Sequence, residues 1–222
     1  MVHNSVDVIA KIIERDENLN SPNNKRAAKL RAKTVMFDEM TPSIIMAGFP
    51  MLDWIDIAMS PVCLPGEVDQ NANIMYVDAA ERMGLAADVC PLPSAEVGCA
   101  IVDDYPQVGS SFITSSMPCD GSLGAALFMD RYMKKLPSFT LTPPQRFNEP
   151  ETNAYAVKDL KNCIRFIEET YDVKWDWDAF WKKAEEYNKT TQCMLDKWDV
   201  NCTPYPQVIG SALSLQSCLL YT

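Results

Sequence analysis

The segment SSFITSSMPCDGS, residues 110–122, decides how this chain is expected to fold. Its apolar, β-branched beginning predicts a strand over residues 111–116, and residues 121–136 have the apolar spacing of a helix. Cys119 stands between the two. Its thiol is therefore expected at the carboxyl end of a strand and beside the amino end of a helix, where ligands and catalytic groups collect in open α/β sheets. The positive end of a helix also favours the thiolate, which is the form of cysteine that binds metal.

Cys90 marks a second loop, DVCPLPSAEVG, residues 88–98. Two prolines after the cysteine hold this loop extended, and Ser94 is the expected N-cap of a helix over residues 94–102. Soft thiolates in such loops suit iron–sulfur ligation, whereas each cysteine alone is also compatible with ordinary apolar packing. Cys90 meets Cys119 only if both loops end at the same edge of the sheet.

The composition is that of a globular protein with an acidic surface. The 222 residues are 47% hydrophobic and 23% charged, and the net charge is −10, so nucleic acid is not expected as a partner. No stretch has the roughly 18 consecutive apolar residues of a membrane helix, and the first residues lack the apolar core of a signal peptide. The sequence therefore predicts a cytoplasmic protein with no membrane partner.

Histidine is almost absent, and this limits the chemistry open to the eight cysteines. His3 is the only histidine, so a Cys–His nucleophilic pair or a His-rich metal site has no other imidazole to use. A strand–turn–helix elbow at Cys119 also resembles the elbows that present nucleophiles in hydrolases, but the Gly-x-Ser-x-Gly pattern is not there. Three further cysteines, Cys99, Cys163 and Cys193, fall in helical patterns and are assigned to packing.

Short apolar runs and helical patterns alternate through the first two thirds of the chain. This alternation predicts an α/β fold, namely a Rossmann- or flavodoxin-like parallel sheet with flanking helices, followed by a helical segment. Helices are expected over residues 6–15, 25–40, 52–60, 71–84, 94–102 and 121–136, and strands over 43–47, 61–64, 111–116 and 138–142.

Two long helices are expected after residue 152. The first covers residues 154–171 and has one apolar stripe, and Asp176 is the expected N-cap of the second. The inner face of the second helix is expected to form a core from Trp177, Trp181, Ala184, Met194 and Trp198.

The predicted organisation has four parts. They are an N-terminal helical segment (1–42), an α/β domain that carries the cysteine loops (43–150), the long helices (151–202) and the start of a missing or truncated second domain (203–222).

Short motifs follow one another in a fixed order from residue 47 to residue 122. They are AGFP (47–50), PVCLPGE (61–67), AERMGLAADVC (80–90), the glycine at 98, DYP (104–106) and PCDGS (118–122), with TPYPQVIG (203–210) much later. This order resembles the 2-hydroxyacyl-CoA dehydratase family, which includes the D-component of 2-hydroxyglutaryl-CoA dehydratase and the benzoyl-CoA reductase subunits. The resemblance covers most of the chain.

The resemblance implies a hydro-lyase that eliminates water from an (R)-2-hydroxyacyl-CoA to give an enoyl-CoA. Subunits of the family pair into a heterodimer, and each holds a [4Fe-4S] cluster by three cysteines, with one iron left open as a Lewis acid. An ATP-dependent iron–sulfur activator protein supplies one electron, which converts the acyl-CoA thioester into a ketyl radical anion. Cys90 and Cys119 match the first and second cluster cysteines.

Two features depart from the family pattern. The family's third cysteine lies in a second α/β domain, and this chain stops near the expected start of that domain. It is therefore expected to be a fragment, or a relative with an incomplete or partner-completed cluster, and no motif identifies Cys202 or Cys218 as the third ligand. Glu67 is the candidate for the base that removes the β-proton, and a surface glutamate beside a turn is the alternative. A benzoyl-CoA reductase-like subunit and a non-catalytic scaffold without a cluster stay open as alternative functions.

Overall fold

The computed structural model describes residues 25–37, 43–56, 71, 73–105, 108–117, 120–132, 136–144 and 149–205. The chain divides into two compact units, one formed by Met1–Ser43 with Met51–Lys174 and the other by Ile44–Pro50 with Trp175–Thr222. The first unit contains a β-sheet with helices, and the second is built around one long helix. The helix expected over residues 6–15 and the strand expected over 61–64 lie outside the described residues.

Within the described ranges, the sheet of the first unit has four parallel strands in the order β2-β1-β3-β4. The strands are β1 (Thr34–Phe37), β2 (Asp53–Asp56), β3 (Ser111–Ser115) and β4 (Ser138–Leu141). Met36 of β1 lies opposite Phe112 of β3, which in turn lies opposite Ser138 of β4. The predicted α/β fold with a parallel sheet is confirmed, as are the two strands expected near residues 111 and 138.

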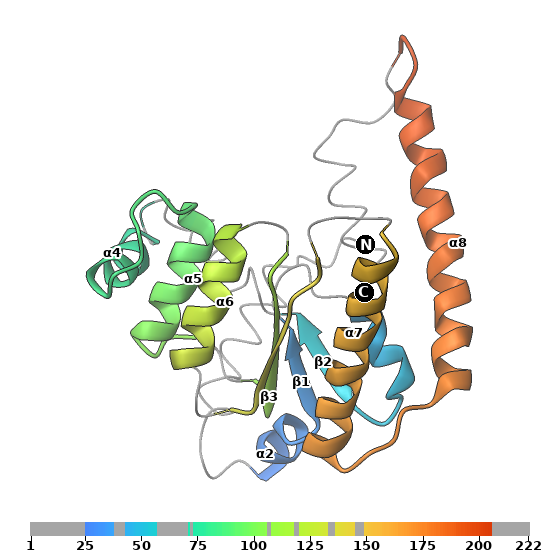
Figure 1. Cartoon of the computed structure of the whole chain (residues 1–222), viewed down its shortest axis with the longest axis horizontal. Helices are drawn as coiled ribbons and strands as arrows, with labels where there is room; N and C mark the ends of the chain where they lie inside the picture. The colour runs from blue at the N-terminus through green and yellow to red at the C-terminus, as the bar shows by residue number, and fades with distance from the viewer. Residues whose placement is uncertain are drawn as a thin grey trace. The chain divides into compact units, whose positions relative to one another are not determined.

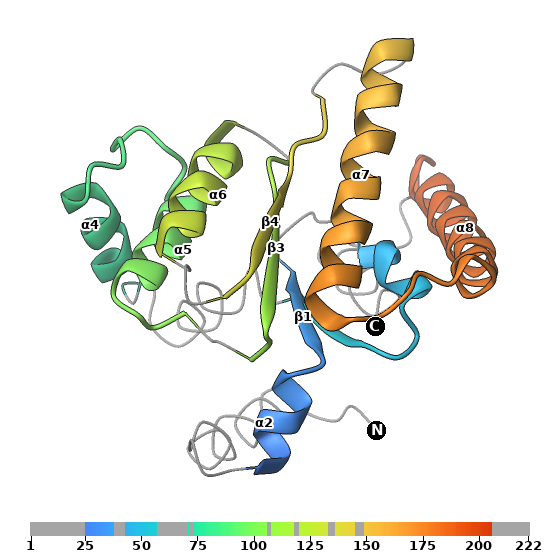
Figure 2. The ribbon, with the colours of Figure 1, turned by 60° about the horizontal axis from the view of Figure 1, so that its bottom comes forward.

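Helices cover both faces of this sheet. Figure 2 shows α5 (Pro91–Ile101) and α6 (Asp120–Tyr132) on one side and α7 (Pro150–Tyr171) on the other. On the α7 side, the rings of Phe139 and Phe166 lie 5.6 Å apart, and the backbone N–H of Thr142 donates to Asp159 at 2.8 Å. The alternation of strands and helices therefore produced the layered architecture that the sequence predicted.

One tyrosine near the end of α7 ties that helix to the amino ends of the two central strands. The hydroxyl of Tyr171 donates to the carbonyl of Thr34 at 2.9 Å and forms hydrogen bonds with the hydroxyls of Ser110 and Ser111 at 3.1 and 2.7 Å. Burial raises the pKa of Tyr171, so the phenol stays protonated and can donate. At the opposite, carboxyl edge of the sheet, β3 ends at Ser115.

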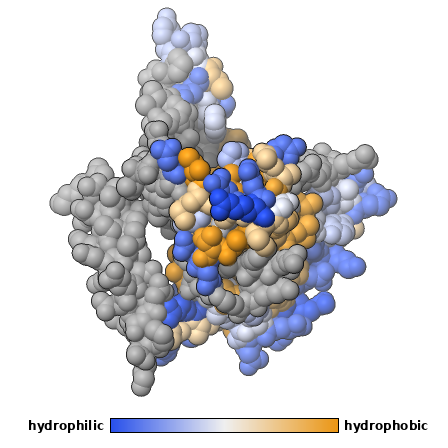
Figure 3. All heavy atoms as spheres, turned by 90° about the vertical axis from the view of Figure 1, so that its left-hand side faces the viewer, coloured by the Kyte–Doolittle hydropathy of each residue, from blue (hydrophilic) through white to orange (hydrophobic). Residues whose placement is uncertain are grey.

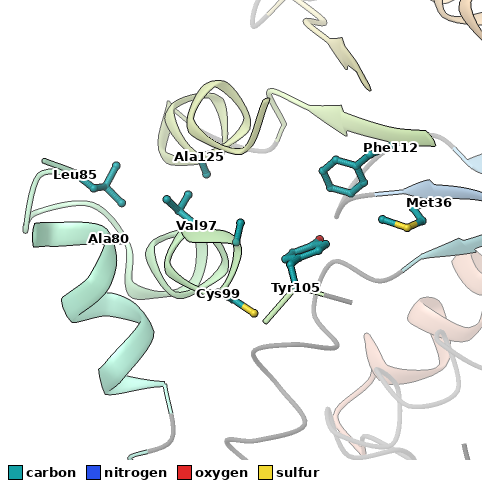
Figure 4. Packing of buried hydrophobic residues seen from close by; sticks show 9 residues of the cluster. Met36, Ala80, Leu85, Val97, Cys99, Tyr105, Phe112 and Ala125 are labelled. Carbon is teal, nitrogen blue, oxygen red and sulfur yellow. The ribbon is translucent and has the colours of Figure 1, made fainter. Parts of the chain in front are cut away.

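The core of the first unit lies between the sheet and the helices α4 (Ile74–Arg82), α5 and α6 (Figure 4). Its buried members are Met36, Ala80, Leu85, Val97, Cys99, Ala100, Tyr105, Phe112 and Ala125. Helices α4 and α5 approach so closely that a Cβ built on Gly98 would overlap the backbone carbonyl of Tyr76. Only glycine fits at this crossing, which gives a physical reason for the glycine at 98.

Helix α4 buries less than its pattern predicts. Residues 74, 77, 80 and 83 were expected to share a buried face, but only Ala80 is buried. Ile74, Met75 and Met83 are each at least half exposed, and hydrophobic residues are visible beside hydrophilic ones on this side of the molecule (Figure 3). The close approach of Gly98 to the backbone of Tyr76 brings the two helices together, and Ala80 is the residue of α4 that the core covers.

Three predicted elements near the start of the chain are wrong. The helix expected over 25–40 ends early as α2 (Lys25–Arg31), and the central strand β1 follows it. The helix expected over 52–60 is instead the edge strand β2, and the strand expected over 43–47 is the 3-10 helix η1 (Ser43–Gly48). For β1 the reason is that a short, buried parallel strand is apolar without alternation, so its pattern cannot be told from a helix segment by periodicity alone.

The second unit joins residues 44–50 to the start of α8 (Trp177–Asn201). Phe49 packs edge-on against Trp175 at 5.2 Å, and the N–H of Asp176 donates to the carbonyl of Gly48 at 2.8 Å. A Cβ built on Gly48 would lie 2.5 Å from the ring of Trp175. Asp176 caps α8 as predicted, because its carboxylate accepts from the N–H groups of Asp178 and Ala179.

The aromatic face of α8 does not form the expected core within the described residues. Trp177, Trp181 and Trp198 are each more than half exposed, and the rings of Trp177 and Trp181 stack at 6.3 Å on the helix surface. A stripe of aromatic residues on one face predicts burial against a neighbour but does not name that neighbour. No helix in the parts of the chain that the structure describes is both long and apolar enough to cross a membrane.

Candidate functional site

The structure describes one of the three residues that the sequence assigned to the site. Cys90 is described, whereas Glu67 and Cys119 lie outside the described residues. For Cys119, the described chain stops at Met117 and resumes with Asp120, the first residue of α6. The placement of Glu67 and Cys119 therefore stays a prediction.

Cys90 is the N-cap of α5, a position that the sequence had assigned to Ser94. The helix begins three residues earlier than expected because Pro91 occupies its first position, where the missing N–H has no helical partner to lose. A residue that precedes proline is pushed out of the helical region, and Cys90 has the matching extended backbone, with φ −50° and ψ 134°. The two prolines, which were expected to hold an extended loop, therefore lie in the first turn of α5.

The thiol of Cys90 is free and exposed, and it makes no capping hydrogen bond. Its backbone carbonyl is held instead, by the hydroxyl of Ser94 at 2.9 Å and by the N–H of Ser94 at 3.3 Å. A sulfur atom at the amino end of a helix lies where the macrodipole favours negative charge. The arrangement therefore presents a free, exposed thiol on a backbone that the hydrogen bonds from Ser94 hold in place.

Behind Cys90, α5 is an almost completely buried helix. Every residue from 93 to 100 is buried, including Ser94 and Glu96. The first residue after the helix to be buried is Tyr105, whose ring packs edge-on against Phe112 near the start of β3 at 5.7 Å. The carboxyl end of α5 thus lies near the amino end of β3, and its amino end with Cys90 lies toward the carboxyl edge of the sheet.

The carboxyl edge is also where α6 begins. Helices α5 and α6 pack side by side, and α6 starts after β3 has ended at Ser115 (Figure 1). From β1 the chain moves to one side for β2 and to the other side for β3, so the strand order reverses between β1 and β3. Ligands of open α/β sheets bind outside the carboxyl ends of the strands at such a reversal.

A buried polar pair between α5 and the residues that follow it was not predicted from the sequence. Tyr105 donates a hydrogen bond to the carboxyl group of Glu96 at 2.9 Å, and both residues are buried. The sequence does contain an indication of this pair, because Glu96 is the only charged residue between Pro91 and Ile101. A single charge in an apolar helix indicates either an exposed edge or a buried partner, and here the partner follows the helix in sequence.

The other described cysteines divide into two groups. Cys99 and Cys163 are buried, and burial raises the pKa of each thiol to about 12, with nearby carboxylates adding to the effect. These two are neutral packing residues, as predicted. Cys193 was also assigned to packing but is exposed on α8, as is Cys202 directly after that helix.

Cys90 fits the chemistry of one cluster ligand, and within the described residues no complete site appears. Within the described ranges, no three side chains of His, Cys, Asp or Glu converge in a way that would hold a metal ion. Cys90 meets the requirements for one ligand, because it is a free and exposed thiol on a rigid helix end.

These features define the class of protein: an open parallel α/β protein with a thiol-bearing helix end toward the carboxyl edge of its sheet. Residues 65–220 match the family model of 2-hydroxyglutaryl-CoA dehydratase, D-component. The match spans more than half of the chain, and the chain belongs to this family. The resemblance seen in the sequence motifs is thereby confirmed. No protein of curated function matches the chain.

Membership of this family places the chain among dehydratase components, which are lyase subunits that work in a complex with a partner subunit. The matched region begins just before Glu67 and includes both Cys90 and Cys119.

Proposed function

We propose that this chain is a subunit, or a part of one, of an iron–sulfur 2-hydroxyacyl-CoA dehydratase in which Cys90 and Cys119 are ligands of a [4Fe-4S] cluster. The observation that carries the proposal is the free, exposed thiol of Cys90 at the amino end of buried helix α5, inside the family-matched region. Cys119 comes directly before α6, whose neighbour is α5. Two thiolates at the amino ends of adjacent helices would share one edge of the sheet and the positive ends of two helix dipoles.

The residues of this chain would hold the cluster and keep its surroundings rigid. Cys90 contributes a thiolate whose backbone is already set before any ligand binds, so little ordering is left for the binding step. When bound, the cluster would supply an iron with an open position that acts as a Lewis acid on the leaving hydroxyl group. The buried core behind α5 fixes the helix that presents this ligand.

The proposed reaction balances as a loss of water. An ATP-dependent activator protein gives one electron to the acyl-CoA thioester, which becomes a ketyl radical anion, and the C2 hydroxyl then leaves as hydroxide. A base, for which Glu67 is the candidate in this chain, takes a proton from C3. The electron is returned in the last step, so the net products are enoyl-CoA and water, and the electron acts catalytically. The proposed partners are thus a second dehydratase subunit, the activator protein and an acyl-CoA, all in the cytoplasm.

Anaerobic purification of the full chain with its partner subunit tests the cluster. We expect absorption at about 400 nm from thiolate–iron charge transfer, together with bound iron and sulfide. Cys90→Ala is expected to lose most of the iron of this subunit. Cys193→Ala is the matched control, because Cys193 is equally free and exposed but lies on α8, and it should keep the iron. A wild-type protein without iron and sulfide would contradict the proposal and favour a scaffold role.

The reaction itself is tested by its need for the activator. Conversion of a 2-hydroxyacyl-CoA to the enoyl-CoA should require both the activator protein and ATP hydrolysis. Dehydration without them would point to ordinary acid–base chemistry, and ring reduction of an aryl-CoA would identify the benzoyl-CoA reductase-like alternative.

A further inference from the structure

We propose that Ser94 is a positioning residue for Cys90: its buried hydroxyl holds the backbone carbonyl of the cysteine and so fixes the position from which the thiol can bind a ligand. This inference rests on the proposed role of Cys90 as a cluster ligand. It assigns to Ser94 a task that differs from the helix-capping task the sequence suggested for it.

The first turn of α5 has few backbone N–H groups that could donate a hydrogen bond. An N-cap side chain ordinarily accepts from the N–H of the second or third helical residue. Here the third residue is Pro93, which has no N–H, and the first is Pro91, so Leu92 carries the one backbone donor of the first three positions. The capping bond that would tie up the side chain of Cys90 is largely removed, and the thiol makes no such bond.

Ser94 supplies the restraint that a capping bond would have given. Its hydroxyl donates to the carbonyl of Cys90 at 2.9 Å, which is shorter than the 3.3 Å of the helical N–H bond to the same oxygen. Ser94 is only 3% exposed, so water has little access to replace the hydroxyl. The restraint acts on the backbone of the cysteine and leaves its sulfur unoccupied.

In an ordinary N-cap, the bond that fixes the residue also occupies its side chain. In α5, two prolines and one serine fix Cys90 through its backbone instead. Pro91 restricts the backbone angles of Cys90, Pro93 removes an N–H that could have bonded to its side chain, and Ser94 holds its carbonyl. A ligand that is held in this way loses little freedom when it binds, which slows its release.

The rate of iron release to a chelator measures this positioning role. Full-length protein with its partner subunit is purified anaerobically, and release to an excess of a ferrous chelator is followed by absorbance. Ser94→Ala is expected to release iron roughly fivefold faster than wild type, the factor that corresponds to about one net hydrogen bond. Pro91→Ala, at an exposed position, retains the hydroxyl but relaxes the backbone and is expected to show a smaller acceleration.

Two controls separate positioning from general loss of stability. Ser111→Ala removes a buried serine hydroxyl that bonds to Tyr171 instead of Cys90, and Thr190→Ala removes the same type of bond to the fourth preceding carbonyl on α8. Both are expected to release iron at the wild-type rate, even if Ser111→Ala lowers the melting temperature. The signal of the reduced cluster in electron paramagnetic resonance should change in Ser94→Ala and stay unchanged in both controls.

The outcomes distinguish this inference from the proposed function. If wild type holds iron and Cys90→Ala loses it, but Ser94→Ala and Pro91→Ala release iron at the wild-type rate, the role of Ser94 is refuted while the cluster proposal stands. Equal acceleration in Ser111→Ala would also refute it, because the effect would then be general. A wild-type protein without iron overturns both.

Discussion

Helices α5 and α8 are the two extremes of this molecule. Helix α5 has 11 residues, and eight consecutive ones are buried, so each of its polar groups needs a partner inside the protein. Helix α8 has 25 residues with large aromatic side chains on its surface, and residues 44–50 contact Trp175 and Asp176 directly before it. Burial therefore holds the short helix α5 along most of its length. The candidate ligand Cys90 caps the amino end of this helix.

The largest expected effect is at the crossing of α4 and α5. Gly98→Ala should destabilise the protein by more than about 4 kcal/mol or prevent folding, because the new Cβ would overlap the backbone of Tyr76, which cannot move aside as a side chain can. Chemical denaturation measures the change. Gly124→Ala on α6 is the matched control, since its Cβ would meet no atom within 4 Å, and it should be neutral or stabilising. If Gly98→Ala were as stable as Gly124→Ala, the close approach of α4 and α5 at Gly98 would be contradicted.

The next effect is alkaline destabilisation. The thiols of Cys99 and Cys163 ionise near pH 9.0 in the unfolded chain and near pH 12 in the folded one, since burial raises their pKa. Their contribution to stability is complete below pH 9 and is lost as the pH rises toward 12, at up to about 1.4 kcal/mol per pH unit for each thiol. Unfolding free energies measured across this range should fall less steeply in Cys99→Ala than in wild type.

The exposed Cys193 of α8 provides the control for that slope. Cys193→Ala should follow the wild-type curve, because its thiol is already in water in the folded protein. A shallower curve in this variant than in Cys99→Ala would contradict the assignment of the buried thiols.

A smaller effect is expected from the buried hydrogen bond on α5. Tyr105→Phe removes the hydroxyl that donates to Glu96 and should cost about 1–2 kcal/mol of unfolding free energy. The corresponding change on α8 is Lys183→Ala, which breaks an exposed ion pair with Glu186 of 2.7 Å and should leave the melting temperature unchanged. If Lys183→Ala lowered the stability more than Tyr105→Phe, the exposed ion pair of α8 would contribute more than the buried hydrogen bond of Glu96, contrary to this prediction.

The smallest effect is expected for an exposed aromatic residue of α8. Trp198→Ala should change the unfolding free energy by less than about 0.5 kcal/mol, because the side chain is 56% exposed. Thermal unfolding of the full chain measures this. A loss of several kcal/mol would show that the aromatic face of α8 is covered in solution, as the sequence had predicted.

The sequence was most informative where one local cause decides the structure. Asp176 caps α8 because its carboxylate reaches two nearby N–H groups, and no distant residue is needed. Strand β1 was missed because TVMF is four residues long and continues a helical pattern, and its pairing with Trp54 and Phe112 comes from distant segments. The candidate site shows the same difference. The sequence singled out Cys90, but the start of α5 at Pro91 and the hydrogen bond from Ser94 to the carbonyl of Cys90 became visible only in the structure.

The uneven distribution of tryptophan has a spectroscopic consequence. Of the five tryptophans, only Trp54 belongs to the sheet unit, where it packs edge-on against Phe37, and the other four belong to the unit of α8. Intrinsic fluorescence excited at tryptophan therefore reports mainly on the helical unit, whereas circular dichroism reports on both. Denaturation curves that differ between these two probes would reveal separate unfolding of the units, and coincident curves would indicate one cooperative transition.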